Sequence, residues 1–331
     1  MQYIAVRSLV NREYLLKVVR SKYALEGVTS CNPLKVGGSN DIFLLTSSKR
    51  KLILKIFFQR QCWGYSEEHY LFELELQQYL NACGIPSSKT IVNKFGALID
   101  RILLAEGERF FAVYEFTKGA KWDHVTLKKQ RFYKLGQTIA RLHDVSQQFV
   151  STSSAQRKLD INLMLDKSWY NIEHLVQLPS NKIKQELSSI YREMKAEAQN
   201  LLATQELLLI HGDVHCGNHL YYSATDTITL IDFELCGYGF VNYELSVLKH
   251  DLINNGHKHH FINKVMHEFL NGYAAFSKNP IDQNLINFFV RLRYFFMLGS
   301  SFLFYPDKVE FNNAHILNNF IKAIKKAEKL H

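Results

Sequence analysis

Hydrophobic side chains change their spacing several times along the first third of the chain. In residues 8–25 apolar side chains recur at helical spacing, which predicts an amphipathic helix. Two apolar runs follow, DIFLLT (41–46) and KLILKIFF (51–58), and the polar stretch SSKR between them is typical of a β-hairpin. The pattern therefore predicts a helix followed by paired strands.

Helical spacing returns in residues 66–84 and stops at Gly84, a residue typical of helix C-caps. Residues 95–116 then predict further strands. Helix, strands, helix and strands in this order indicate a small α+β lobe, to which we assign residues 1–113.

The rest of the chain has mainly helical patterns. Residues 128–145 carry their apolar side chains on one helical face, and so do residues 183–202. Between them, STSSAQRK (151–158) is polar and is predicted to be a linker. Because only residues 206–234 are rich in β-forming side chains, we expect residues 120–331 to form a larger, mainly helical lobe with a β-rich insertion.

Composition changes this picture little. Hydrophobic residues make up 47% of the 331 residues and charged residues 21%, as in an ordinary globular protein. The five cysteines are an odd number and form no CxxC pair, which indicates a reducing compartment. The N-terminus does not resemble a secretory signal, and the apolar stretch 294–305 is too short to span a bilayer. We therefore expect a cytoplasmic protein without a membrane partner.

The formal net charge of +9 raises the alternative of a nucleic-acid-binding protein. Lysine and arginine are, however, spread along the chain rather than gathered in one block. The densest cluster, IKAIKKAEKLH (321–331), is typical of the solvated face of a terminal helix. We expect no nucleic-acid partner, and a mildly basic surface also suits a polyanionic nucleotide.

Three polar residues in the β-rich insertion have a spacing that indicates chemistry. The runs LLLI, HLYY and TITLIDFE predict strands, and SATD between the last two predicts a turn. If those two strands pair, Asn218 and Asp232 meet at the open end of the hairpin, and Asp213 faces the same point. Amide and carboxylate oxygens suit Mg²⁺, and a carboxylate base with two metal ligands suits phosphoryl transfer.

The same stretch, HGDVHCGNH, offers two other interpretations. His211, His215 and His219 fall at every fourth residue, which suggests zinc ligands if the segment is helical. Two glycines and the flanking strand patterns disfavour a helix. A purely structural polar turn accounts for Gly212, but it leaves the spacing of Asp213, Asn218 and Asp232 unexplained.

Lys55 provides an independent indication from the first lobe. It lies within LILKIFF, where alternation places it on the same face as Ile53 and Phe57. A lysine on an apolar face needs a partner if it is buried. Glu73 or Glu75 on the following helix can supply the partner, and a nucleotide phosphate can complete the site; a solvent-facing lysine is the alternative.

With these residues in place, the sequence resembles the aminoglycoside phosphotransferase and choline kinase family. HGDVHCGN resembles the family's HGDxHxGN loop, and LIDFELCGYGFVNYEL resembles its IDFE…G…(D/E)L segment. LILKIFF matches the strand with the family's lysine, and LGQTIARLHD matches the helix that precedes the loop. The resemblance covers residues 36 to about 246 and implies a bilobal protein-kinase-like fold, with YEFTKG (114–119) as the hinge.

The resemblance also implies roles for individual residues. Asp213 would accept the proton of the substrate hydroxyl, and Asn218 and Asp232 would hold Mg²⁺ at the phosphates of ATP. Lys55 would contact the α- and β-phosphates and pair with Glu73. The nucleotide would also contact Ser39, Asn40, Glu115 and Phe116. His211 and His215 would support the loop from behind.

Two positions depart from the family pattern: Cys216 replaces a frequent proline, and Glu244 replaces a usual aspartate. Neither position is among the residues assigned to the chemistry. No long activation segment follows Asp232, which favours a small-molecule kinase over a protein kinase. Candidates for binding a cationic acceptor lie in the second lobe: Asp160, Asp166, Trp169, Tyr170, Glu173, Glu234 and the aromatic side chains of the run RLRYFFM (291–297).

The sequence thus predicts an ATP- and Mg²⁺-dependent phosphotransferase that acts on a hydroxyl of a small molecule, such as an aminoglycoside-like antibiotic, an amino alcohol or a sugar. The alternatives are a kinase-like stress protein that phosphorylates proteins and a non-catalytic nucleotide- or zinc-binding module. We expect a monomer or a homodimer.

Overall fold

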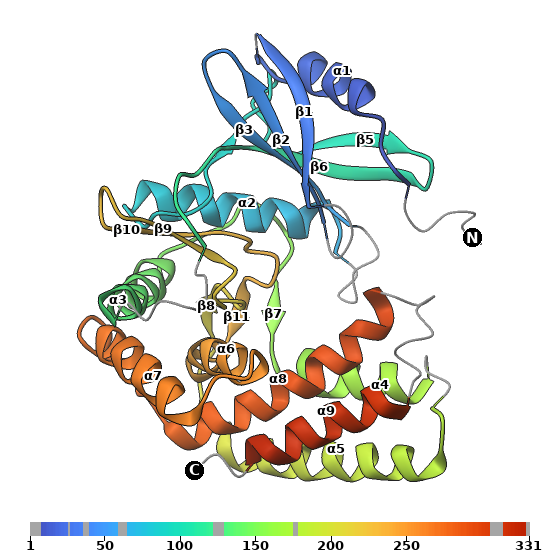
Figure 1. The fold of residues 1–331 in the computed structure, drawn as a ribbon, viewed down its shortest axis with the longest axis vertical. Helices are drawn as coiled ribbons and strands as arrows, with labels where there is room; N and C mark the ends of the chain where they lie inside the picture. The colour runs from blue at the N-terminus through green and yellow to red at the C-terminus, as the bar shows by residue number, and fades with distance from the viewer. Residues whose placement is uncertain are drawn as a thin grey trace. The chain divides into compact units, whose positions relative to one another are not determined.

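Two compact units make up the chain in a computed structural model, which describes residues 8–25, 27–35, 40–58, 65–121, 129–174, 178–304 and 314–328 (Figure 1). The first unit combines Met1–Lys118 with the short segment Val150–Ala155. The second combines Gly119–Phe149 with Gln156–His331.

An antiparallel sheet forms the centre of the first unit, with strand order β1-β2-β3-β6-β4 and β5 paired to β6. The predicted hairpin is confirmed, because β2 and β3 pair from Asp41 opposite Ile56 to Thr46 opposite Lys51. The strand bounds are β1 Val28–Lys35, β2 Asp41–Ser47, β3 Lys51–Ile56, β4 Thr90–Ile91, β5 Asp100–Leu104 and β6 Gly107–Glu115.

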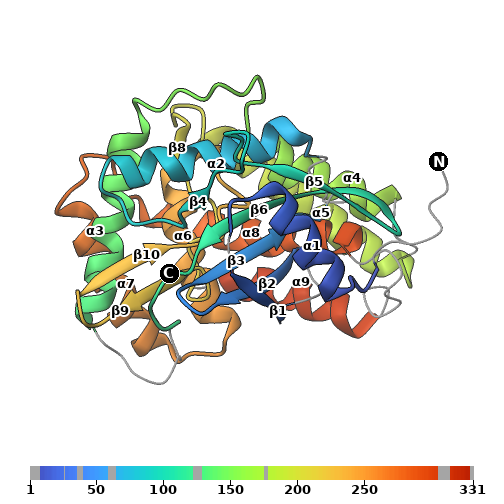
Figure 2. The ribbon, with the colours of Figure 1, turned by 90° about the horizontal axis from the view of Figure 1, so that it is seen from above.

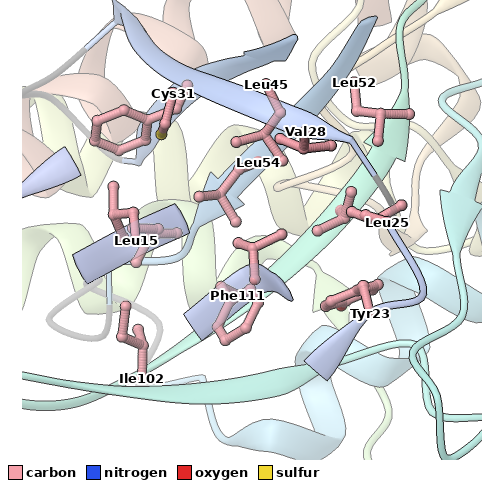
Figure 3. Packing of buried hydrophobic residues seen from close by; sticks show 14 residues of the cluster. Leu15, Tyr23, Leu25, Val28, Cys31, Leu45, Leu52, Leu54, Ile102 and Phe111 are labelled. Atoms are coloured by element: carbon pink, nitrogen blue, oxygen red, sulfur yellow. The ribbon is translucent and has the colours of Figure 1, made fainter. Parts of the chain in front are cut away.

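Helices α1 (Arg12–Lys22) and α2 (Glu67–Ala82) pack on opposite faces of this sheet. Alternation along β6 produces both interfaces, since Phe111 packs with α1 and Phe110 packs with α2. Figure 3 shows Leu15 of α1 turned toward the same interior as Leu54 and Phe111. Both predicted helices are confirmed.

The N-terminus of α1 differs from the prediction. The helix begins at Arg12 rather than near residue 8, because the side chain of Asn11 accepts hydrogen bonds from the backbone N–H groups of Glu13 and Tyr14. Leu9, which the periodicity included, lies outside the helix and is 93% exposed. A local cap therefore outweighs a continuing apolar pattern.

The polar segment Val150–Ala155 packs on α2 through hydrogen bonds. Ser151 Oγ and the backbone N–H of Thr152 donate to Glu75 Oε2, at 2.5 and 3.0 Å. Ser153 Oγ donates to the carbonyl oxygen of Glu68 at 2.7 Å, and the N–H of Ser154 donates to the Glu68 carboxylate at 3.1 Å. This part of the predicted linker is therefore held to α2 by hydrogen bonds and belongs to the first unit. We call the segment Val150–Ala155 the brace.

The second unit is mainly helical, as predicted. Figures 1 and 2 both place the β9–β10 hairpin beside α3, and α4 and α5 at the other end of this unit. The helix bounds are α3 Lys129–Ser146, α4 Lys167–His174, α5 Asn181–Leu201, α6 Val241–Asn254, α7 His259–Ala274, α8 Gln283–Phe304 and α9 Ala314–Glu328, with a π-helical turn, η1, at Asn162–Asp166.

Close backbone approach joins α3 to α7. The predicted apolar face of α3 is buried, and two glycines let the helices touch. A Cβ at Gly136 would lie 2.0 Å from the carbonyl oxygen of Phe269, and one at Gly272 would lie 1.9 Å from that of Tyr133. Neither crossing position therefore accommodates a side chain.

The β-rich insertion contains the predicted hairpin and the predicted strand before it, whereas two short strands that pair with that strand's sheet were not predicted. Strand β9 (His219–Tyr222) pairs antiparallel with β10 (Thr227–Leu230), which confirms the hairpin. The predicted strand LLLI is confirmed as β8 (Leu208–Ile210), which pairs with β11 (Gly237–Gly239), and β11 also pairs with β7 (Lys158–Leu159). β7 and β11 have only two and three residues and no apolar run, so they carry too little pattern to be recognised in the sequence.

The apolar stretch expected to be too short for a bilayer lies mostly in α8. Among the described residues, no helix has both the length and the apolar character needed to cross a membrane.

Buried histidines give the second unit a predicted pH dependence of stability. His250 on α6 is buried with its ring centroid 4.2 Å from that of Tyr294. Burial, together with the nearby charge of Arg293, holds the pKa of His250 well below its usual value. The unfolded chain then binds the extra proton, so this contribution to stability is complete above pH 6.5 and is lost as the pH falls.

We therefore expect the His250→Phe variant, which keeps the ring contact, to gain stability relative to the parent protein by about 2 kcal/mol between pH 7.5 and pH 5. Urea unfolding followed by circular dichroism at both pH values measures this difference. The variant His260→Gln, at an exposed histidine, is the control and should follow the parent at both pH values. Parallel curves for His250→Phe and the parent would contradict the prediction.

Candidate functional site

A buried ion pair lies at the centre of the first unit. Lys55 on β3 is 5% exposed, and its Nζ lies 3.0 Å from Oε1 of the fully buried Glu73 on α2. The predicted alternation of β3 places Lys55 on the face that packs against α2, where its Nζ also lies 5.0 Å from the ring centroid of Phe57. Of the two glutamates considered, Glu73 is the partner, because Glu75 binds the segment at residues 150–155.

Such a pair is costly to bury. Desolvating both charges offsets most of their attraction, so a buried ion pair is weak evidence for stability. Buried charges that are retained on an otherwise apolar face are candidates for function. Lys55 and Glu73 meet that description.

The other nucleotide-site candidates of the first unit are more scattered. Asn40 is buried, and its Oδ1 accepts a hydrogen bond from the N–H of Phe58 at 3.0 Å, so it ties together the ends of β2 and β3. Glu115 forms a surface ion pair with Lys89 at 2.9 Å, and Phe116 is exposed at the end of β6. Ser39 lies outside the described residues.

In the second unit, the loop between β8 and β9 is held by its own backbone and side chains. His211 Nε2 lies 3.1 Å from the carbonyl oxygen of Ile231, and His211 Nδ1 accepts from the N–H of Asp213 at 3.2 Å. Within the loop, the N–H of His215 donates to the carbonyl oxygen of Asp213, and the N–H of Asn218 donates to that of His215. The loop is therefore a set of tight turns rather than a helix.

This geometry bears on the zinc interpretation, since each of the three histidines uses a ring nitrogen within the loop. His215 Nδ1 accepts from the N–H of Gly217 at 2.9 Å, and His219 Nδ1 lies 3.2 Å from the carbonyl oxygen of His215. Burial lowers the pKa of His219 to about 3. Across the described residues, no group of three or more His, Cys, Asp or Glu side chains is arranged to hold one metal ion.

The carboxylate of Asp213 has a different partner on each oxygen. Asn218 Nδ2 donates to Asp213 Oδ2 at 2.9 Å and to the carbonyl oxygen of Asp213 at 3.0 Å. Arg293 NH2 donates to Oδ1, and His215 Nε2 lies 3.6 Å from Oδ2. Asp213 is thus fixed in orientation while its side chain stays 20% exposed.

The residues expected to hold a metal ion fit a small divalent cation. Because the amide nitrogen of Asn218 faces Asp213, its oxygen points the other way. The N–H of Ile231 donates to the carbonyl oxygen of Asn218 at 2.9 Å, which brings the neighbouring Asp232 to the same end of the hairpin. An amide oxygen and a carboxylate are typical Mg²⁺ ligands, with phosphates and water completing the shell.

Asp232 has an unusual backbone conformation. Its φ is +62°, in the left-handed region that few non-glycine residues adopt. The predicted strand through residue 234 ends instead at Leu230, because the chain turns at Asp232. Residues held in this region cluster at functional sites, where the surrounding structure maintains the strain.

A buried carboxylate, Glu244 on α6, anchors the loop from behind. Its Oε2 accepts from the N–H of Gly212 at 3.0 Å and lies 3.8 Å from Nε2 of His143. Burial by itself raises the pKa of Glu244, but His143 and His211 beside it outweigh burial and lower that pKa below its usual value. His143 in turn contacts Tyr273 Oη at 2.8 Å, so α3 and α7 share this anchor.

The acidic candidates for acceptor binding are largely engaged within the protein. Asp166 accepts from Lys195 Nζ at 2.5 Å and from Tyr191 Oη at 3.0 Å. Trp169 stacks on the ring of Tyr191 at 5.4 Å between centroids. The positions of the remaining candidates are as follows: Asp160 Oδ1 accepts from the N–H of Leu163 at 2.9 Å, Glu173 lies 3.6 Å from Lys184 Nζ, Tyr170 is exposed, and Glu234 is buried.

Sequence reasoning did not identify Arg293 as a partner of Asp213. The run RLRYFFM was noted for its aromatic side chains, and Arg293 lies 80 residues from the aspartate it contacts. The only local signal is an arginine among apolar neighbours on a helix, comparable with that of Lys55 on its strand.

Comparison with known proteins identifies the family that this sequence matches. A model described as the phosphotransferase enzyme family matches residues 30–277. Amicoumacin kinase of Bacillus subtilis is 24% identical over 249 residues, which cover 71% of this chain and 69% of that protein. A Synechocystis protein of uncharacterised function is 26% identical over 72% of this chain, and the match spans 63% of its own length, less than two thirds.

Solved structures confirm the expected fold. The amicoumacin kinase hAmiN, solved in complex with AMP-PNP, Ca²⁺ and Ami, has a TM-score of 0.75 at 22% identity and covers 97% of this chain and 95% of its own. A microcompartment-associated aminopropanol kinase has a TM-score of 0.70 at 18% identity, with coverage of 95% and 94%. The α+β fold is therefore that of the protein-kinase-like small-molecule kinases.

A substitution at Gly212 tests whether the loop depends on the close backbone packing at this residue. Its φ is +81°, and an added Cβ would lie 2.2 Å from the carbonyl oxygen of Leu235. We expect Gly212→Ala to lose at least about 2 kcal/mol of unfolding free energy, because left-handed strain and a backbone clash add together. Urea unfolding measures the loss.

Gly256→Ala is the matched control for Gly212→Ala. Its φ is +73°, but nothing lies within 4 Å of an added Cβ, so only the conformational strain of about 1 kcal/mol applies. Equal losses for the two variants would show that the approach of Leu235 to Gly212 does not constrain the loop.

Proposed function

The chain belongs to the phosphotransferase enzyme family, and on that premise we propose that it transfers the γ-phosphate of ATP to a hydroxyl group of a small molecule. The observation that carries the proposal is the carboxylate of Asp213, oriented by Asn218 on the loop before the hairpin. A fixed carboxylate beside two oxygen ligands supplies the parts that phosphoryl transfer requires, since this chemistry depends mainly on positioning and charge stabilisation.

Lys55 is proposed to bind the α- and β-phosphates of the nucleotide. Its ion pair with Glu73 holds the ammonium group in one place on β3, so a phosphate meets a cation that is already positioned. The backbone at Glu115 and Phe116 is proposed to receive adenine, and Ser39 and Asn40 are proposed to lie near the phosphates. These assignments follow from the family motifs.

Asn218 and Asp232 are proposed to hold Mg²⁺. When bound, the ion would neutralise charge on the phosphate oxygens. Their own contribution is geometric: Asn218 presents an amide oxygen because its nitrogen is used by Asp213, and Asp232 lies in a left-handed turn just after β10, at the end of the hairpin.

In the proposed reaction, Asp213 accepts the proton of the acceptor hydroxyl as the oxygen forms its bond to the γ-phosphorus. The bond from that phosphorus to the β,γ-bridging oxygen breaks, and ADP leaves. His211 and His215 are proposed to support the loop, since their contacts are with loop backbone atoms and, for His215, with Asp213.

The acceptor is proposed to be a hydroxylated compound. Amine-bearing acceptors are among the classes to test, because amicoumacin kinase and aminopropanol kinase are similar to this chain. Asp166, Trp169 and Tyr170 were predicted to bind such an amine. Asp166 is already neutralised by Lys195, and Glu234 is proposed for that role because it lies two residues after the proposed metal ligand Asp232. Because Asp166 is neutralised, an acceptor without a cationic group is also compatible with the site.

The proposed function predicts that Asp213→Asn lowers ADP release by at least about 100-fold, because the proton acceptor is lost, while ATP binding persists. Coupled ADP detection against amicoumacin, aminoglycosides, aminopropanol, choline, ethanolamine and amino sugars measures activity, and calorimetry measures binding. Asp226→Asn, on the turn of the same hairpin, is the control and should keep parent activity. An active Asp213→Asn enzyme would end the proposal, and label appearing on added proteins alone would indicate a protein kinase.

Metal dependence provides a separate prediction. A chelator should abolish activity and Mg²⁺ should restore it, and Asp232→Asn should raise the Mg²⁺ concentration needed for half-maximal activity by at least about 10-fold. Elemental analysis of the purified protein accompanies the titration. Stoichiometric zinc that resists the chelator would overturn the assignment of the loop.

A further inference from the structure

We propose that Arg293 is a positioning residue for catalysis: it fixes the carboxylate of Asp213 through Oδ1 and is itself fixed by Tyr243. This inference rests on the proposed function, since it assigns a role relative to Asp213 as the base. It adds a residue of α8, outside the motifs that carry the family resemblance, to the residues that hold the loop.

The contacts of Arg293 form a bridge between two partners. Its NH2 group donates to Asp213 Oδ1, and its NH1 group donates to Tyr243 Oη on α6 at 2.7 Å. Its Cζ lies 6.0 Å from the ring centroid of Tyr243. The two terminal nitrogens of one planar group thus join the base to the helix behind it.

The surroundings leave Arg293 little freedom to move. The residue is 5% exposed, and its neighbours Leu292 and Tyr294 on α8 are buried as well. Tyr243 packs edge-on against Phe289, with 5.7 Å between ring centroids, so the partner of NH1 is also held by the core. A cation in such a place is costly unless its charge is compensated, and Asp213 supplies the compensation.

The ionised states suit this arrangement. Burial lowers the pKa of Arg293, but Tyr243 and Asp213 outweigh burial and raise it above its usual value. Burial also raises the pKa of Tyr243 to about 12, which keeps its hydroxyl neutral and able to accept from NH1. The guanidinium therefore stays charged at any working pH.

Together, Arg293 and Asn218 constrain both oxygens of the base. Oδ1 receives the guanidinium and Oδ2 receives the amide, so rotation of the carboxylate about its Cβ–Cγ bond breaks both hydrogen bonds. The acceptor hydroxyl must then approach a carboxylate of fixed orientation. Since misplacement of a reacting group by about 1 Å can cost 100-fold in rate, such fixation is sufficient to matter for turnover.

Geometry and charge can be separated by substitution. A lysine at position 293 keeps the positive charge, but a single ammonium group cannot reproduce the planar fork that reaches Asp213 and Tyr243 together. Tyr243→Phe keeps the guanidinium and the ring while removing the acceptor of NH1. Arg293→Ala removes the whole group and leaves space for a free guanidinium ion.

A matched control lies two residues earlier on the same helix. Arg291 NH2 binds Glu197 on α5, away from the loop, so Arg291→Lys tests the loss of an arginine fork on α8 without altering Asp213. It should retain the turnover of the parent protein.

The experiment measures kcat and KM for ATP and for the best acceptor of the screen, with calorimetric ATP binding and urea unfolding for every variant. We expect Arg293→Lys and Arg293→Ala to lower kcat by about 100-fold while KM for ATP changes less than about threefold, and Tyr243→Phe to lower kcat by about 10-fold. Added guanidinium chloride at millimolar concentration should partly restore Arg293→Ala, and sodium chloride should not.

A merely structural role would lower the folded fraction and leave kcat per folded molecule unchanged in Arg293→Lys and Tyr243→Phe, and that result would overturn the inference. If Arg293→Ala fails to fold, those two milder variants decide the question. Should Asp213→Asn abolish turnover while every Arg293 variant keeps parent kcat, the proposed function stands and this inference alone fails. If Asp213→Asn retains activity, both fail.

Discussion

One buried carboxylate holds the loop between β8 and β9 to the helices of the second unit. Glu244 accepts the backbone N–H of Gly212 and lies beside His143, whose other nitrogen contacts Tyr273. Through these contacts the start of the loop is tied to α6, α3 and α7 at once. Gly212 can lie against Glu244 only because it lacks a Cβ, since the carbonyl oxygen of Leu235 fills that space. The position of Asp213, the next residue, follows from this anchor.

Local features of the fold and site could be predicted because they depend on residues close in sequence. Alternation along β3 places Lys55 toward α2, and the hairpin from β9 to β10 brings Asn218 and Asp232 to one end. Arg293 could not be found in this way, because its contact with Asp213 depends on how α8 packs against α6. The left-handed turn at Asp232 is equally invisible, since aspartate is compatible with either conformation.

The acceptor candidates illustrate a second limit of sequence reasoning. Asp166 has the charge expected for binding an amine, yet Lys195 and Tyr191 already occupy both of its oxygens. Residue type gives the chemistry that a side chain can perform, and its neighbours decide whether that chemistry is available. The proposed base, Asp213, shows the converse: its carboxylate is also paired, but its side chain stays partly exposed on a loop whose other polar groups are bonded among themselves.

The brace at Val150–Ala155 has a consequence for how members of this family can be recombined. This segment binds Glu68 and Glu75 of α2, the helix that also carries Glu73, although it lies between two stretches of the second unit. A chimaera that exchanges only residues up to Lys118 would import an α2 whose two glutamates face a foreign segment. The exchangeable module is therefore discontinuous, and a graft intended to carry the lysine–glutamate pair intact needs residues 150–155 from the same parent.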